Sequence, residues 1–245
     1  MRLRLIGCQL LARELCDAVV RSPHLVDVEL LPAGLHNDGA RAMRTRVQRA
    51  IDAAEAGRYD AVVLGYALCG GGLAGIVARG ARLVLPRAHD CITLLLGGRD
   101  RYNERFARNS GVYYRSAGWV ERADELTQQY LGMVNEADLD TLIDRYGEDG
   151  GRYLYEELTA YHRSYSELAF ISTGLEPDDR FLASARREAG TKGWAFTLID
   201  GDLALFRRLL SGAWDEDFLI VPPSHRITAT CDEAIVAAQP VLPVA

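Results

Sequence analysis

The feature that most constrains this fold is the alternation of short apolar runs with amphipathic stretches over the first 97 residues. Apolar β-type runs occupy residues 3–7, 26–31, 59–64 and 81–85, and helical spacing is found between them at residues 10–20 and 40–56. Alternation of this kind predicts an α/β fold with a parallel sheet. The run at 59–64 is almost continuously apolar, which is typical of a strand buried on both faces.

Right-handed crossover connections limit how these four strands can be ordered, and a flavodoxin-like order of 2-1-3-4 is the simplest choice. The first, third and fourth strands are then neighbours, and each is followed closely by a cysteine: Cys8, Cys69 and Cys91. Neighbouring strands lie roughly 4.8 Å apart. We therefore expect the three thiols to meet at the carboxyl edge of the sheet.

Thiolates that gather at one edge point to a soft metal, because sulfur ligands select zinc, copper(I) or iron–sulfur clusters. The preferred cofactor is an iron–sulfur cluster held by Cys8, Cys69 and Cys91, and zinc is the alternative. The sequence has no Cys-x-x-Cys pair, which disfavours a structural zinc ribbon. The other two cysteines, Cys16 and Cys231, are interpreted as small buried hydrophobes.

Further site residues are expected in the loops that follow the same strands. His36, Arg87 and His89 are candidates for catalytic roles in which they orient the substrate. A surface salt bridge also accounts for Arg87, and His89 is alternatively a fourth metal ligand, a general acid or a helix-start residue. Asp90 is interpreted as the N-cap of a helix that begins near Cys91. The glycine-rich turn after the third strand can bring backbone N–H groups to a bound anion. Its candidate substrate-binding residues are Tyr66, Gly70 and Gly71.

The second half of the chain shows a weaker form of the same pattern. Apolar runs at residues 168–173, 195–202 and 217–224 alternate with helical stretches at 178–189 and 203–210. We interpret the chain as two Rossmann-like parallel-sheet halves, 1–97 and 166–245, related by a weak internal repeat and separated by a mostly helical insertion or lid at 98–165.

Two hydroxyl residues of the second half take positions near strand ends. Thr173 and Ser224 are expected to bind substrate in a cleft between the halves. The alternative is that the second half only completes the sheet and forms a homodimer, with Thr173 as a helix cap.

Charge and hydropathy exclude several classes of partner. The 245 residues carry a formal net charge of −6 without a basic cluster, so nucleic-acid binding is not expected. No apolar run approaches the roughly 20 residues that span a bilayer, and the start of the chain lacks the long apolar segment of a signal peptide. We expect a cytoplasmic protein that binds no membrane and forms no structural disulfide.

Four motifs surround the predicted strand ends. They are Ile6-Gly7-Cys8, Gly34-Leu35-His36-Asn37, the stretch 63–70 that ends in Leu-Cys-Gly, and the stretch 85–92 that contains Pro-Arg-Ala-His-Asp-Cys. Together with residues 113–119 and 218–223 they resemble the blocks of the family called domain of unknown function 1638, over most of the chain. The family is defined by sequence, so the resemblance implies no reaction. It implies an association with corrinoid-dependent methyl transfer, and hence a partner from a corrinoid system.

Two main classes of function remain open. The first is a metal-dependent enzyme whose three-cysteine site binds and activates a small-molecule substrate at an open position, in the cleft between the halves. The second is a non-catalytic accessory protein that binds a metal or ligand, linked to corrinoid-dependent methyl transfer. A third interpretation makes Cys69 or Cys91 a nucleophile, with His36 or His89 as its base.

Overall fold

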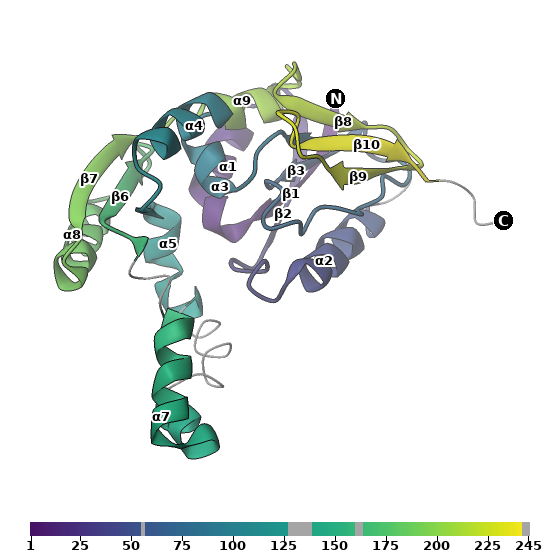
Figure 1. Cartoon of the computed structure of the whole chain (residues 1–245). Coiled ribbons are helices and arrows are strands. Elements are labelled where there is room, and N and C mark those ends of the chain that lie inside the picture. The colour runs from purple at the N-terminus through teal and green to yellow at the C-terminus, as the bar shows by residue number, and fades with distance from the viewer. Residues whose placement is uncertain (55–56, 127–138, 160–163, 242–245) are drawn as a thin grey trace. The chain divides into compact units, whose positions relative to one another are not determined.

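The chain forms two compact units. The computed structural model describes residues 1–54, 57–126, 139–159 and 164–241 (Figure 1). The first unit contains Met1–Arg105, Thr173–Leu175 and Asp200–Ala245, and the second contains Phe106–Ser172 and Glu176–Ile199. This division differs from the expected boundaries at 98 and 166, because the last part of the chain belongs to the same unit as its N-terminal part.

The first unit consists of a βα series followed by three later strands. Its elements are β1 (Arg2–Cys8), the 3-10 helix η1 (Gln9–Leu11), α1 (Ala12–Val20), β2 (Leu25–Leu31), α2 (Ala40–Asp52), β3 (Ala61–Gly65), β4 (Arg82–Pro86), α3 (Cys91–Leu95), α9 (Ala204–Ser211), β8 (Phe218–Val221), β9 (His225–Ala229) and β10 (Val236–Pro240). The boundary between the units falls within α4 (Arg99–Arg108).

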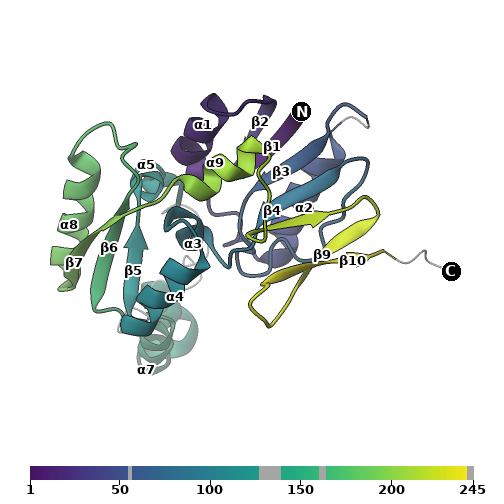
Figure 2. The same ribbon diagram turned by 90° about the horizontal axis from the view of Figure 1, so that it is seen from above.

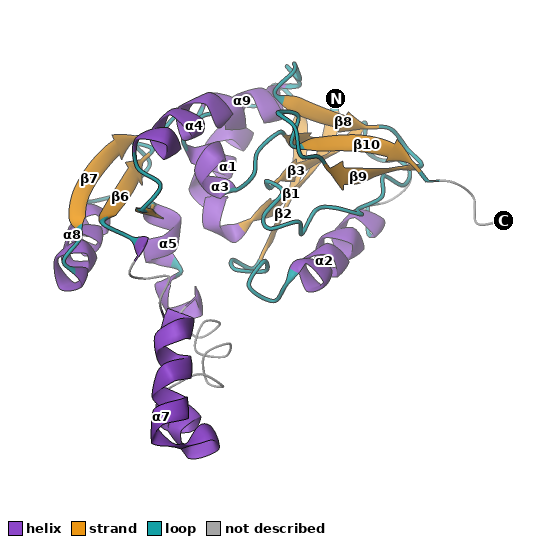
Figure 3. Ribbon diagram, viewed as in Figure 1, coloured by secondary structure: helices purple, strands orange, loops and turns teal. Residues whose placement is uncertain are grey.

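Five of these strands form one sheet in the order β2-β1-β3-β4-β8 (Figure 3). β1 pairs in parallel with β2 and β3, and β3 pairs in parallel with β4. β8 pairs antiparallel with β4, and β9 pairs antiparallel with β10 in a separate sheet. The order 2-1-3-4 predicted for the first four strands is therefore confirmed.

Helices pack on both faces of this sheet. Met43 of α2 lies in the same buried apolar cluster as Ile6 of β1. On the opposite face, Leu15 of α1 packs so closely that a Cβ added at Gly65 would lie 2.8 Å from Leu15 Cδ2. α1 also contacts α9, and Figure 2 shows the two helices side by side. β3 is buried at every position, as its continuous apolar run predicts.

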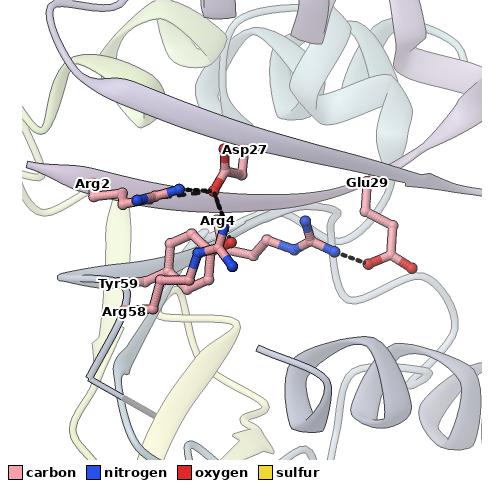
Figure 4. A network of polar contacts seen from close by, with 6 residues as sticks. All are labelled: Arg2, Arg4, Asp27, Glu29, Arg58 and Tyr59. Carbon is pink, nitrogen blue, oxygen red and sulfur yellow. Dashed lines mark hydrogen bonds and ion pairs between the residues drawn. The ribbon is translucent and has the colours of Figure 1, made fainter. Parts of the chain in front are cut away.

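A polar network lies on β1 and β2, toward the amino ends of these strands (Figure 4). Asp27 Oδ2 accepts hydrogen bonds from Tyr59 Oη at 2.8 Å and Arg2 Nη2 at 3.0 Å. These bonds, with that from Tyr59 as the largest cause, hold the pKa of Asp27 below its ordinary value. Arg4 pairs with Glu29 nearby. The network therefore pairs the carboxylates of Asp27 and Glu29, which lie on the edge strand β2, with arginines of the neighbouring strand β1.

The second unit contains a three-stranded sheet in the order β5-β6-β7, in which β5 and β6 are parallel. Phe170 and Phe181 lie at the centre of its apolar core, and α8 ends at Gly193 in the left-handed conformation. Its elements are β5 (Val112–Arg115), α5 (Ala117–Glu121), α7 (Leu139–Thr159), β6 (Glu167–Ser172), α8 (Arg180–Lys192) and β7 (Ala195–Asp200). β5 is a short strand inside the segment 98–165 that was expected to be mostly helical.

The structure supports a mixed α/β fold with a parallel-sheet core, but it does not confirm two Rossmann-like halves or an internal repeat. β8, which was expected to be the third strand of the second half, lies in the first sheet with antiparallel direction. Parts of the expected lid, 127–138 and 160–163, lie outside the described residues. Within the described ranges, no helix is long and apolar enough to cross a membrane.

Candidate functional site

The three cysteines predicted as ligands follow three neighbouring parallel strands. Cys8 is the last residue of β1, Cys69 lies in the turn after β3, and Cys91 is the first residue of α3 after β4. Parallel strands bring their carboxyl ends to one edge of a sheet. The order β1-β3-β4 therefore directs all three cysteines to the same edge.

Two backbone hydrogen bonds join the loop after β3 to the loop after β4. Leu68 N donates to Ala88 O and Cys69 N donates to His89 O, each at 2.9 Å. These bonds place Cys69 beside the segment that leads directly into Cys91. We call the group Cys8, Cys69 and Cys91 the thiol rim.

Cys69 has an unusual backbone conformation. Its φ of 47° lies in the left-handed region, and Gly70 and Gly71 follow with φ of 63° and 86°. Residues other than glycine adopt this region infrequently, and such positions cluster at binding and catalytic sites. The turn is closed by hydrogen bonds from Gly72 N to Cys69 O and from Leu73 N to Leu68 O. The protein thus holds this cysteine in a conformation that a glycine would adopt with less strain.

The thiols of the rim influence one another electrostatically. Burial raises the pKa of Cys69 to about 12, with smaller contributions from Cys8 and Asp90, while a hydrogen bond from the Ala67 backbone lowers it. Burial also raises the pKa of Cys91 well above its ordinary value, and nearby Cys69, Asp90 and Cys8 raise it further. The rim residues therefore lie close enough for a charge on one to act on the others, and these two thiols are protonated at neutral pH.

The side chains of the rim do not form a ready metal site. Within the part of the chain that the structure describes, no group of three or more His, Cys, Asp or Glu side chains is arranged to hold a metal ion. The five cysteines form no disulfide among the described residues. Metal ligation by the rim remains a prediction. The interpretation of Cys16 and Cys231 as buried hydrophobes is wrong, because both are exposed.

Tyr66 and the two glycines after Cys69 lie at the same edge. Tyr66 is only 2 % exposed, and its hydroxyl has no hydrogen-bond partner among the described residues. Burial raises its pKa, with further contributions from Cys8, Cys69 and Glu29. A Cβ added at Gly70 or Gly71 would meet no atom within 4 Å, so space is open beside the turn.

The expected catalytic residues have different environments. His36 and His89 are both exposed, and desolvation by surrounding atoms lowers the pKa of His36 against the opposing effect of Asp38. Arg87 Nη1 donates to the carbonyl oxygens of Ala234, at 2.9 Å, and Val236. Arg87 therefore ties the loop after β4 to the start of β10. The catalytic roles of His36, His89 and Arg87 remain predictions.

The expected hydroxyl residues of the second half lie in different places. Thr173 belongs to the first unit, where its Oγ1 donates to Glu14 Oε1 at 3.0 Å. Ser224 does not lie at the thiol rim: because β8 runs antiparallel to β4, its end leads to the amino edge of that strand, where Ser224 N donates to Ala78 O at 3.0 Å. This strand direction places Ser224 away from the edge at which the thiols lie, and its role in binding substrate remains a prediction.

One buried charged residue was not anticipated. Glu14 in α1 is 1 % exposed, which is rare for a carboxylate. The signal for it was present, because Glu14 follows Leu10 by four residues and precedes Ala18 by four, on the apolar face of the helix. Asp90, by contrast, is confirmed as an N-cap: its Oδ1 accepts hydrogen bonds from Thr93 N and Thr93 Oγ1 at 2.9 and 2.8 Å.

Fold and site together define an α/β protein that presents three cysteines at the carboxyl edge of a parallel sheet. The chain belongs to the family described as Protein of unknown function (DUF1638), whose model matches residues 30–210. The matched region includes Cys69 and Cys91 and begins after Cys8. Comparisons with curated proteins and with solved structures find no match.

Proposed function

We propose that this protein is a metal-dependent enzyme in which Cys8, Cys69 and Cys91 hold an iron–sulfur cluster, or alternatively zinc. Three protein ligands leave one position at which a small molecule can bind and be activated. The proposed setting is the cytoplasm, whose reducing conditions preserve thiols.

The backbone around Cys69 is the observation that carries this proposal. The Cys69 N–H bond to His89 O fixes the turn beside the loop that leads to Cys91, and Cys69 has a left-handed φ of the kind that clusters at functional sites. The backbone is thus organised while the thiol side chains do not yet converge. Ligation requires the three sulfur atoms to approach one metal ion to about 2.3 Å each.

The chemistry of the thiols favours metal ligation over nucleophilic catalysis. A reactive cysteine normally has a lowered pKa, whereas the pKa values of Cys69 and Cys91 are raised by burial. A bound metal deprotonates a coordinating thiol and supplies the compensating positive charge. Backbone N–H groups at Ala67 and Cys91 that interact with the sulfurs are the kind of contact that stabilises ligating thiolates.

The test is the metal content of the full chain purified without oxygen. Elemental analysis is expected to find iron with acid-labile sulfide, or zinc, because three clustered thiolates require a cation. Cys8→Ser, Cys69→Ser and Cys91→Ser are each expected to lose most of that metal. Cys16→Ser and Cys231→Ser are matched controls at exposed positions and are expected to retain it. Folded protein without metal, or metal retained in the three rim variants, would contradict the proposal.

A further inference from the structure

A surface cavity of about 480 Å³ lies toward the amino ends of β1 and β2, away from the edge that holds the thiol rim. Four of the side chains that line it are polar: Arg4, Asp27, Arg58 and Tyr59. They come from β1, from β2 and from the segment that precedes β3. The residues that follow α2, Ala53 and Ala54, also line the cavity.

The sheet is open at this point because α2 ends before it. Alternate residues of a strand share a face, so Arg4 lies on the same face as Ile6. Ile6 is buried in one apolar cluster with Met43 of α2. Arg4 is paired in the strand register with Asp27, and its side chain is still 22 % exposed. The floor of the cavity is therefore charged where the covered part of the same face is apolar.

Arg4 uses only part of its hydrogen-bonding capacity. A guanidinium group carries five N–H donors. Within the part of the chain that the structure describes, this side chain donates only to Glu29, through Nη2, and its Nε is buried without a partner. An unsatisfied polar group of this kind calls for an explanation. A ligand oxygen beside the guanidinium would use donors that the protein leaves open.

The charges around the cavity favour an anion. Arg58 places a second guanidinium in the lining, with Nη2 3.7 Å from Asp27 Oδ2. Asp27 is the one carboxylate among the described lining residues, and hydrogen bonds from Tyr59 and Arg2 already engage it. The C-terminal end of α2 adds only a partial negative charge. Paired guanidinium groups are well suited to the oxygens of a carboxylate or a phosphate.

We propose that this cavity binds a small ligand through a carboxylate or phosphate group, with Arg4 and Arg58 as the residues that recognise it. Both arginines belong to the network drawn in Figure 4. The site is separate from the thiol rim, and the inference does not depend on metal binding there.

The test is isothermal titration calorimetry of the full chain with inorganic phosphate and, separately, with succinate. Both titrations use a chloride buffer of fixed ionic strength, and the anion that binds more tightly identifies the group. Arg4→Gln and Arg58→Gln are each expected to weaken binding roughly 10- to 100-fold, because a hydrogen bond between charged groups is lost. Arg46→Gln is the matched control, since it makes the same change of charge at an exposed position of α2.

A change at Glu29 should have the opposite effect. Glu29 competes with the ligand for Arg4, so Glu29→Gln is expected to tighten anion binding. If the ion pair only maintained the structure, Glu29→Gln would weaken binding as Arg4→Gln does. Asp100→Asn removes a negative charge from a side chain that is 97 % exposed and controls for net charge.

Three results would overturn the proposal. The first is that neither anion binds the natural chain. The second is that Arg4→Gln and Arg58→Gln bind the anion as tightly as Arg46→Gln. The third is weaker binding in Glu29→Gln than in Asp100→Asn. Circular dichroism of each variant confirms that it is folded, so that a lost affinity reports on the cavity.

Discussion

Cys69 combines two features that are unfavourable for a cysteine. Its backbone adopts a conformation suited to glycine, and partial burial raises the pKa of its thiol. Each feature is unfavourable for the isolated residue, and both are imposed by the hydrogen bonds of the surrounding turn. A residue maintained under such conditions is the natural first target for mutation.

The raised pKa of Cys69 predicts a stability change in alkaline solution. Between its ordinary value of 9.0 and about 12, the thiol ionises in the unfolded chain but not in the folded one. The stabilisation it contributes is therefore complete below pH 9 and is lost as the pH rises toward 12. Urea unfolding of metal-free, reduced protein from pH 8 to 10.5 measures this effect. The free energy of unfolding should fall less steeply with pH in Cys69→Ala than in the natural chain. Cys231→Ala, at an exposed position, should show the same pH dependence as the natural chain. If Cys69→Ala also showed that pH dependence, the prediction would be refuted.

The bond between Thr173 and Glu14 leads to a second prediction at this scale. Thr173→Val keeps the shape of the side chain and removes the hydroxyl that Glu14, at 1 % exposure, accepts from. A hydrogen bond to a charged group contributes roughly 1.5–3 kcal/mol, so urea unfolding should show a loss of about that size. Thr191→Val is the control, since Thr191 is exposed and its hydroxyl donates to Arg187 O in its own helix. Equal effects of the two substitutions would show that the buried bond is unimportant.

At the scale of elements, the approach of α1 to β1 and β3 depends on two glycines. The side chain of Leu15 occupies the space in which a side chain at Gly7 or Gly65 would lie. This close packing positions α1 directly after Cys8, at the edge where the thiols meet. The short Ile-Gly-Cys segment therefore determines how near the first helix comes to the sheet.

Gly65→Ala should be destabilising for this reason. Its Cβ would lie 2.8 and 2.9 Å from the two terminal carbons of Leu15 and 3.2 Å from Gly7 Cα. Overpacking of a core costs about 1–3 kcal/mol, measurable as a lower urea midpoint. Gly190→Ala provides the contrast, since it lies within α8 with no atom within 4 Å and should gain roughly 0.5–1 kcal/mol. A neutral Gly65→Ala would mean that Leu15 moves away without cost.

At the scale of the whole molecule, the division into two units implies that stability is not uniform along the chain. Each unit has its own sheet and its own apolar cluster. In the second unit, Arg115 forms a bidentate pair with Glu188 and lies over the ring of Tyr113. Burial opposes the charge of Arg115, and the hydrogen bonds that Arg115 donates to Glu188 raise its pKa despite that burial.

Substitutions in one unit are therefore expected to act mainly on that unit. Glu188→Gln should increase hydrogen exchange in peptides of β5, β6 and α8, because a partly buried pair loses one charge. Gly65→Ala should increase exchange in β1, β3 and α1 instead. Mass spectrometry of exchanged peptides measures both patterns. Uniform acceleration across the chain by either substitution would show that the units unfold as one.

Three features were predictable from sequence alone: the βα series, the order of its first four strands, and the position of three cysteines at one edge. These follow from local periodicity together with the handedness of crossovers, both of which are independent of distant contacts. The Asp90 cap was also predictable, because its partner lies three residues away. The direction of β8, and with it the placement of Ser224 away from the thiols, emerges only in the folded protein. The same holds for the partners of Arg87 and Thr173 and for the burial of the Tyr66 hydroxyl. These depend on segments more than 100 residues apart, or on the register of neighbouring strands, which no local pattern encodes.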